Sequence, residues 1–253
     1  MHSAIPDNLE QIRRRIAGAA VRAGRAPESV RLVAVSKNHP AEAVAAAYAA
    51  GQRVFGENRP QELRDKRLQL PVDCEWHMIG HLQSNKARLA VQTAAWIHSV
   101  NAVDLLQRLD RVAGEEAGGP QPEAGNAQHA TRNTKRPVIL LEINIAGEAS
   151  KSGARPDAAR ELLEAALRSP HLDCRGLMTM APYDAPEAEL RRVFGGLREL
   201  RDRLAAEFGA PLPELSMGMS DDFEIAVEEG STLVRVGTAI FGERDYGKTG
   251  GPG

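Results

Sequence analysis

The chain has 253 residues, with 32 Lys and Arg against 34 Asp and Glu, so its formal net charge is -2. This length can bury a sizeable core, and the charge balance offers no bulk attraction to nucleic acid or to an anionic membrane. A composition that is 42% hydrophobic and 26% charged excludes a wholly disordered chain.

An amphipathic helix is expected at the start of the chain. Asp7 is predicted to be its N-cap, Leu9, Ile12 and Ile16 share one face, and Gly24 ends it. The charged residues of 1–18 do not fit a signal peptide, and no apolar run in the chain is long enough to span a membrane. Cys74 and Cys174 lie far apart, which fits a reducing compartment. We therefore expect a cytoplasmic protein that does not enter membranes.

Eight short runs rich in Val, Ile and Leu follow this helix, and each has the length and boundaries of a β-strand. They cover residues 32–36, 54–57, 75–80, 96–100, 138–144, 173–180, 214–219 and 233–241. Helices are expected between them, including one between Pro40 and Gly51, one over 157–168, one over about 186–208, and one capped by Asp221 or Asp222 that ends before Gly230.

This alternation predicts an α/β protein, a single (β/α)8 TIM barrel with an extra N-terminal helix. A doubly wound open sheet is the alternative, but it normally uses fewer strands, and no Gly-rich dinucleotide fingerprint follows the first run. We expect one domain over 1–246, with a flexible insertion at 114–136 that is rich in Gly, Pro, Gln and Asn, and a disordered tail at 247–253.

A lysine at the end of the first strand is the first candidate site residue. Lys37 follows the apolar run Leu-Val-Ala-Val at 32–35, and functional groups of a TIM barrel gather at the C-terminal ends of its strands. Low-dielectric walls favour the neutral amine, which can form a Schiff base with a carbonyl compound. A lysine that only extends into solvent is the alternative interpretation.

Two stretches near the end of the chain have the features of a phosphate site. Ser216 precedes a predicted helix N-terminus, and Gly237 with Thr238 interrupts the eighth run and offers a backbone N–H and a hydroxyl. TIM barrels commonly bind phosphate in the loops after strands seven and eight. A strand kink is the simpler explanation for Gly237 alone.

A Schiff-base lysine and a phosphate site together indicate pyridoxal 5'-phosphate (PLP), which carries both an aldehyde and a phosphate. Arg235 shares a strand face with Gly237 and is expected to meet the pyridine nitrogen. An ion pair at the barrel mouth is the alternative for this arginine.

Several motifs together resemble the PLP homeostasis protein family over nearly the whole chain. They are Val-Ser-Lys at 35–37, Phe-Gly-Glu-Asn at 55–58, Trp-His-Met-Ile-Gly-His-Leu-Gln-Ser-Asn-Lys at 76–86, Ser-Lys-Ser-Gly at 150–153, Arg-Gly-Leu-Met at 175–178, Leu-Ser-Met-Gly-Met-Ser-Asp-Asp at 215–222 and Arg-Val-Gly-Thr-Ala-Ile-Phe-Gly at 235–242. Asn38 and His39 depart from the family's usual pattern, and the insertion at 114–136 is longer than expected.

The resemblance implies a barrel like the N-terminal domain of alanine racemase, with Lys37 as the cofactor lysine. It also implies phosphate contacts at Ser216, Gly237 and Thr238, an Arg235 contact to the ring nitrogen, and Asn58 beside the cofactor. The implied function is to bind and buffer PLP and to hand it to apo-enzymes, without an established catalytic reaction. We expect a monomer.

Two enzymatic alternatives stay open: a PLP-dependent racemase of the alanine racemase type, and a Schiff-base aldolase acting on a sugar phosphate. A zinc site at His77 and His81 is not supported, because no His-Glu-x-x-His pattern or third ligand accompanies them. We instead expect His77 to be a buried, hydrogen-bonded barrel residue, and no metal is predicted.

Overall fold

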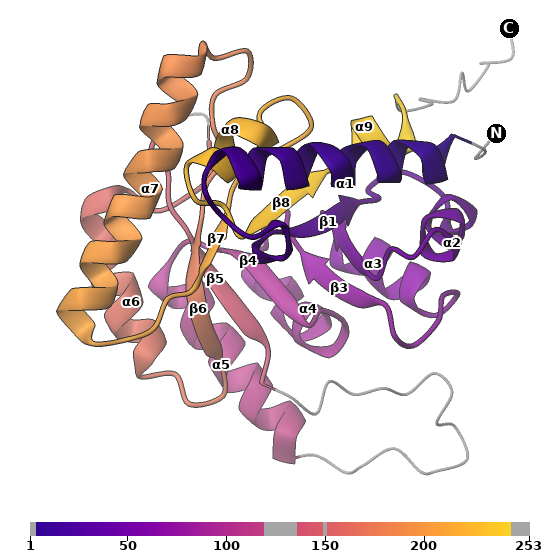
Figure 1. The fold of residues 1–253 in the computed structure, drawn as a ribbon. Coiled ribbons are helices and arrows are strands. Elements are labelled where there is room, and N and C mark those ends of the chain that lie inside the picture. Colours follow the sequence, from indigo (N-terminus) through magenta and orange to yellow (C-terminus); the bar gives the residue numbers. More distant parts are fainter. Residues whose placement is uncertain (1–3, 119–135, 149–150, 244–253) are drawn as a thin grey trace, which may run out of the picture.

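A closed barrel forms the centre of the molecule (Figure 1). The computed structural model describes residues 4–118, 136–148 and 151–243. Within these ranges, parallel strands β1 to β8 follow one another around the barrel in chain order, and β8 pairs with β1. This confirms the predicted TIM barrel, and the open sheet is excluded because the first and last strands are hydrogen-bonded.

The strands contain the runs of β-branched and aliphatic residues seen in the sequence. Their bounds are β1 (Arg31–Val35), β2 (Val54–Glu57), β3 (Glu75–Met78), β4 (Trp96–Val100), β5 (Val138–Glu142), β6 (Asp173–Met178), β7 (Glu214–Ser216) and β8 (Leu233–Val236). The helices are α1 (Ile5–Arg22), α2 (Ala41–Ala49), α3 (Pro60–Arg67), α4 (Ala87–Thr93), α5 (Val103–Gly118), α6 (Ala159–Leu167), α7 (Glu187–Phe208), α8 (Phe223–Glu228) and α9 (Thr238–Phe241).

All eight predicted strands are present, but the prediction that the eighth continues to residue 241 is wrong. β8 ends at Val236, and residues from Thr238 turn into the short helix α9. The amides of Ile240 and Phe241 donate hydrogen bonds to the carbonyl of Gly237, at 2.8 and 3.0 Å. The apolar residues after Gly237 therefore belong to a helical turn at the mouth of the barrel.

The first helix also begins earlier than predicted. α1 starts at Ile5, with Ala4 as the N-cap, so the prediction that Asp7 caps the helix is wrong. Pro6 explains the difference, since proline has no backbone N–H to lose and fits the first helical turn. Asp7 instead lies inside that turn, where its charge complements the helix dipole.

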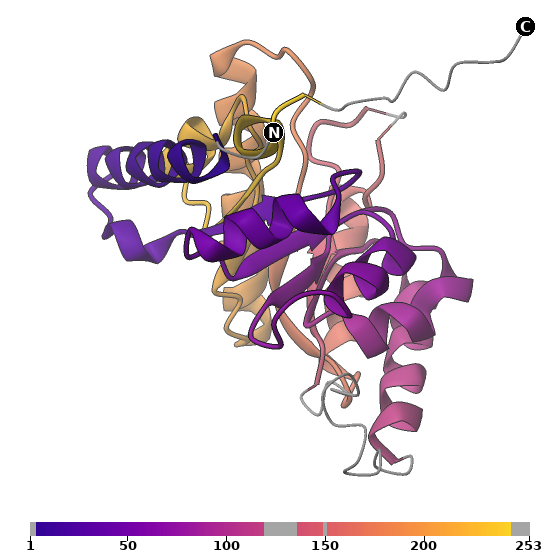
Figure 2. The same cartoon turned by 90° about the vertical axis from the view of Figure 1, so that its right-hand side faces the viewer.

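The helix α1 closes the outer ring of helices beside β8, where α9 is only four residues long. It lies across this side of the barrel, next to α8 and α9 (Figure 1 and Figure 2). Its predicted apolar face is confirmed, because Leu9, Ile12 and Ile16 are buried against the barrel. The amide of Asn8 also donates a hydrogen bond to the carbonyl of Ile240 at 2.9 Å.

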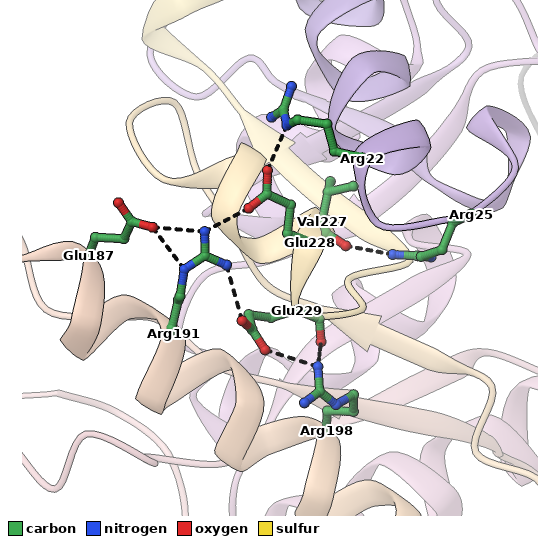
Figure 3. Close-up of polar contacts among 8 residues, drawn as sticks. All are labelled: Arg22, Arg25, Glu187, Arg191, Arg198, Val227, Glu228 and Glu229. Atoms are coloured by element: carbon green, nitrogen blue, oxygen red, sulfur yellow. Dashed lines mark hydrogen bonds and ion pairs between the residues drawn. The ribbon is translucent and has the colours of Figure 1, made fainter.

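A charged network fixes the short helix α8 against α1 and α7 (Figure 3). Arg191 on α7 bonds both Glu228, at 2.7 Å, and Glu229, at 3.2 Å. Arg22 on α1 bonds Glu228 at 2.9 Å, and Arg198 on α7 bonds the carboxylate of Glu229 at 2.9 Å. Single exposed pairs contribute little, but linked pairs fix geometry. The network thus joins the C-terminal end of α8 to α1 and α7.

The barrel interior contains few apolar side chains. Most of the apolar core lies between the strands and the surrounding helices. A separate cluster on the inner side comprises only five buried hydrophobic residues: Val33, Trp96, Leu140, Met178 and Leu233. Layers of branched aliphatic residues usually fill such barrels. Here buried polar side chains occupy much of that space, as the site below shows.

Two parts of the predicted domain organisation fall partly or wholly outside the described residues. Residues 114–118 of the predicted insertion form the end of α5, and 119–135 are not described. The predicted tail at 247–253 is also outside the described residues. In the described ranges, no helix is both long enough and apolar enough to cross a membrane.

Candidate ligand site at the barrel mouth

Lys37 lies where the first strand meets its two neighbours at the C-terminal end of the barrel. On one side, a Cβ atom at Gly237 would be only 3.1 Å from the carbonyl oxygen of Val35. On the other, the amide of Ser36 donates to the carbonyl of Gly56 at 3.0 Å. The half-buried Lys37 therefore follows a segment held between the ends of β8 and β2.

The chain turns sharply directly after Lys37. Asn38 has a φ of 63°, in the left-handed region where asparagine is one of the few side chains found regularly. The backbone amide of Asn38 donates a hydrogen bond to the carboxylate of Glu62 at 2.7 Å. An asparagine at this position, a departure from the usual family pattern, thus suits the local backbone.

Asn58 is half-buried directly after β2 and lies under the loop that follows β3. A Cβ atom at Gly80 would lie 2.5 Å from the Asn58 carbonyl oxygen. Only glycine allows this close approach. The two loops therefore pack together beside the segment that carries Lys37.

The predicted phosphate residues Gly237 and Thr238 form the start of α9. The ring of His39, just after Lys37, lies 5.2 Å from the ring of Phe241 on α9. The amide of Ala239 donates to the hydroxyl of Ser220 at 3.4 Å, which joins α9 to the loop after β7. Ser220 is a further polar residue of this mouth, at the end of the Ser-Met-Gly-Met-Ser motif.

Arg235 and Ser216 are in direct contact below the mouth. An Nη atom of Arg235 donates to the Ser216 hydroxyl at 2.6 Å, and its other Nη atom donates to the carbonyl of Thr179 at 3.0 Å. Both residues are buried, and burial lowers the pKa of Arg235 to about 10. The Ser216 hydroxyl is thus already engaged by Arg235, so its predicted phosphate contact stays a prediction.

Gly218 sets the shape of the loop after β7. It has a φ of 94°, and a Cβ atom there would lie 2.6 Å from the Cβ of Ala226. Its carbonyl accepts a hydrogen bond from the amide of Arg235 at 2.9 Å. Any other residue would push this loop off α8 and disturb the backbone that holds Arg235.

Histidines on adjacent strands continue the polar contacts into the barrel. His77 is fully buried and hydrogen-bonded, which confirms that prediction, whereas His81 is exposed. His98 was missed, although it stands alone inside the apolar run Trp-Ile-His-Ser-Val at 96–100. It is fully buried, bonds His77 at 2.8 Å and bonds Ser216 at 2.9 Å. Among the described residues, no group of three His, Cys, Asp or Glu side chains is placed to bind a metal ion.

A buried ion pair flanks Lys37 on the other side. The ammonium of Lys66 contacts Glu57 at 2.6 Å, Glu62 at 2.8 Å and the carbonyl of Ser36 at 2.7 Å. Glu57 and Lys66 are both buried, and the hydroxyl of Ser36 donates to Glu57 at 2.6 Å. Because Ser36 precedes Lys37, this cluster fixes the backbone on which the lysine stands.

A buried carboxylic acid at the end of β5 is a further group that the sequence did not select. Burial raises the pKa of Glu142 to about 7, even though the charge of Arg235 and a hydrogen bond from Asn101 act in the opposite direction. The folded protein therefore keeps a proton on Glu142 that the unfolded chain releases near pH 4.5. This proton should be visible in the stability of the protein.

We expect the stability of the wild type relative to Glu142→Gln to fall as pH rises from about 5 to 7, by a few kcal/mol. The folded wild type holds the Glu142 proton in this window, so the contribution of Glu142 is greatest below it and is lost as pH rises through the folded pKa. Burial lowers the pKa of His77 and His98, which acts in the opposite direction, but both proteins share this effect and it cancels in the difference. Glu142→Gln should therefore be more stable than the wild type at pH 8. Urea denaturation at a series of pH values measures the difference, with the exposed-site variant Glu161→Gln as control. Parallel curves of unfolding free energy against pH for the wild type and Glu142→Gln would contradict a raised pKa at Glu142.

The fold and the lysine after the first strand define the general class of the chain. The sequence model of the family "Alanine racemase, N-terminal domain" matches residues 3–245. The class is therefore a TIM barrel of the alanine racemase N-terminal type.

Comparison with curated relatives narrows this class. A PLP homeostasis protein of Aquifex aeolicus is 39% identical over 241 residues, covering 95% of this chain and 98% of its own. One of Pseudomonas aeruginosa is 42% identical over 246 residues, covering 97% and 98%. The structure of PipY from Synechococcus elongatus with PLP bound is 41% identical, has a TM-score of 0.75, and covers 91% of this chain and 100% of that one. The chain belongs to the PLP homeostasis protein family.

Proposed function

We propose that this protein binds PLP through a Schiff base on Lys37 and takes part in intracellular PLP homeostasis by buffering and delivering the cofactor. The observation that carries this proposal is the position of Lys37 between the end of β2 and the start of α9, with Arg235 buried below the mouth. In the bond-forming step, the lysine amine condenses with the aldehyde and releases one water molecule.

The residues at the mouth fit the remaining parts of this ligand. Gly237 and Thr238, with a hydroxyl and the backbone amides at the start of α9, suit a phosphate. Ser216, also predicted to contact the phosphate, would have to leave its bonds to Arg235 and His98 to do so. Arg235 is assigned to the pyridine nitrogen and Asn58 to the side of the ring. A guanidinium can only donate hydrogen bonds, so it would pair with the bare lone pair of that nitrogen, leave it largely unprotonated and weaken the ring as an electron sink.

This arrangement favours binding over catalysis. The relative PipY is solved with PLP bound, and the curated relatives carry the name of homeostasis proteins. Of the tyrosines in the described part of the chain, Tyr48 bonds Asp73 and Tyr183 is strongly exposed, so neither is held in a buried site as an acid or base. We further propose that the protein acts as a monomer in the cytoplasm and that its partners are apo forms of PLP-dependent enzymes.

Covalent labelling tests the binding function. Dialysed protein is incubated with PLP, reduced with borohydride, digested and analysed by mass spectrometry. We expect one PLP per chain, on the peptide that contains Lys37. If borohydride traps a sugar phosphate on the protein but traps no PLP, the Schiff-base aldolase is favoured. Absence of any PLP label would overturn the proposal.

Two assays separate delivery from catalysis. PLP-loaded protein should reactivate an apo-enzyme that depends on PLP, at a rate different from that of the same concentration of free PLP. The loaded protein should leave the α-hydrogens of a mixture of amino acids unexchanged in deuterium oxide. Deuterium incorporation that is lost in Lys37→Ala would instead establish the racemase alternative.

A further inference from the structure

A chain of hydrogen bonds crosses the interior of the barrel from the mouth toward its opposite end. It begins at Arg235 on β8, passes through Ser216 on β7 and His98 on β4, and reaches His77 and Glu75 on β3. The successive distances are 2.6 Å, 2.9 Å, 2.8 Å and 2.9 Å. At the far end, Arg31 donates to the same Glu75 oxygen at 3.2 Å. All members but Glu75 and Arg31 are buried.

The ends of this chain carry opposite charges. Burial opposes the ionised form of Glu75, but the hydrogen bond from His77 and the charge of Arg31 outweigh it and lower the pKa of Glu75. At the other end the guanidinium of Arg235 can only donate. The two histidines lie between a fixed acceptor and a fixed donor.

Both histidines are neutral at pH 7 and above, because the pKa of each lies below its ordinary value of 6.5. Burial lowers the pKa of His77 despite the opposing effect of Glu75, while Arg31 adds to the lowering and Glu214 opposes it. Burial lowers the pKa of His98 well below its ordinary value, and the charges of Arg235 and Arg31 act in the same direction. A neutral imidazole has one N–H and one bare nitrogen, so each histidine donates once and accepts once.

These constraints fix the direction of every hydrogen bond. The Glu75 carboxylate accepts, so the Nε2 of His77 carries a proton and its Nδ1 is bare. The Nε2 of His98 must then donate to that Nδ1, which leaves the Nδ1 of His98 bare. The Ser216 hydroxyl must donate to this nitrogen, and its oxygen lone pairs remain for Arg235. Only one arrangement satisfies all four contacts.

We propose that His98 and His77 are positioning residues that orient the Ser216 hydroxyl and thereby hold Arg235 at the mouth of the barrel. Aligned donors in a dry interior reinforce one another, so the Glu75 charge favours the guanidinium form of Arg235 at a distance. The ring of His77 stacks on Trp96, with ring centroids 5.2 Å apart and planes at 11°, and this contact holds the imidazole in the orientation that its two hydrogen bonds require. That Arg235 meets a pyridine nitrogen rests on the proposed function, but the orientation of Arg235 does not.

Nuclear magnetic resonance on the ligand-free protein tests the direction of the chain. Long-range proton–nitrogen spectra of protein labelled in histidine should show His77 and His98 as neutral Nε2–H tautomers at pH 7 to 8, with free histidine in the same buffer as reference. Single His→Gln variants assign the signals. An Nδ1–H tautomer at either position, or a charged imidazole at pH 7, would overturn the proposal.

The positioning role is tested on the guanidinium of Arg235. In the wild type its N–H signals should exchange slowly and its rotation should be restricted. His98→Phe should speed exchange by about tenfold or more, because Ser216 and His77 lose a partner. His98→Asn, which retains an acceptor near the position of Nδ1, should restore slow exchange. Equal exchange in wild type and His98→Phe, with the fold checked by circular dichroism, would show that the histidines do not position Arg235.

PLP titration of the same variants separates this inference from the proposed function. His98→Phe should bind PLP about tenfold more weakly than the wild type, and His98→Asn within about threefold. If the wild type itself binds no PLP, the proposed function is wrong. The histidine tautomers and the exchange rate of the Arg235 N–H protons still test the positioning role in that case.

Discussion

Replacement of Lys37 by alanine is expected to abolish the visible absorption band that forms when the wild type is mixed with PLP. The band requires a Schiff base between the aldehyde and a primary amine, and alanine removes that amine. The proposed phosphate and ring contacts would remain, so weak binding without the Schiff-base band should persist. Spectrophotometric titration with borohydride trapping measures both properties.

Two matched variants make the Lys37 experiment specific. Lys37→Arg keeps a positive charge at the mouth but has no amine that can lose its proton near neutral pH, so it should lack the Schiff-base band as Lys37→Ala does. Lys86→Ala removes a half-buried lysine that lies six residues beyond the glycine that contacts Asn58, and it should keep the full band. A band of wild-type intensity in Lys37→Ala, with label on another lysine, would contradict the assignment.

Replacement of Lys66 by methionine is expected to destabilise the protein by about 3–5 kcal/mol at pH 7, because it leaves the buried carboxylate of Glu57 without its counter-charge. One Glu57 oxygen would keep only the Ser36 hydroxyl, and the other already has no hydrogen-bond partner among the described residues. Denaturation with urea measures the loss. Arg64→Met, on the exposed side of α3, is the control and should change stability by less than about 1 kcal/mol.

The pH dependence of the Lys66 effect has a defined sign. Burial raises the pKa of Glu57 even with Lys66 present, against the opposing effects of Lys66 and Ser36. Without Lys66 the carboxyl group takes up a proton more readily, so the destabilisation should shrink as pH falls toward 5. The double variant Lys66→Met with Glu57→Gln should recover much of the loss. A penalty below 1 kcal/mol for Lys66→Met at pH 7 would show that the pair is not held as an ion pair.

The strands and Lys37 could be predicted because both have local signals. A run of apolar β-branched residues with turn residues at each end specifies a strand almost by itself, and Lys37 stands directly after such a run. Strand ends are weaker signals. The apolar residues after Gly237 fit a strand and a buried helical turn equally well, so α9 was missed.

The polar interior could be predicted only in part, since its contacts join residues far apart in sequence. Arg235 and Ser216 were selected, but for a ligand, and nothing in the sequence pairs them with each other. His98 and Ser216 are 118 positions apart and meet across the barrel. The pairing of Lys66 with Glu57 likewise depends on how α3 packs on β2. Local patterns identify such residues as unusual, but only the closed barrel supplies their partners.

The seam between β8 and β1 has a consequence for how the protein matures. Gly237 reaches the segment before Lys37 only after the last strand has paired with the first, so a partly synthesised chain that lacks β8 has no complete site. Such pairing of distant segments is slow compared with local helix formation. The ligand therefore binds only after the barrel has closed. By mass action, this binding stabilises the closed form over any open intermediate. We expect newly made protein to acquire its cofactor only after synthesis is complete.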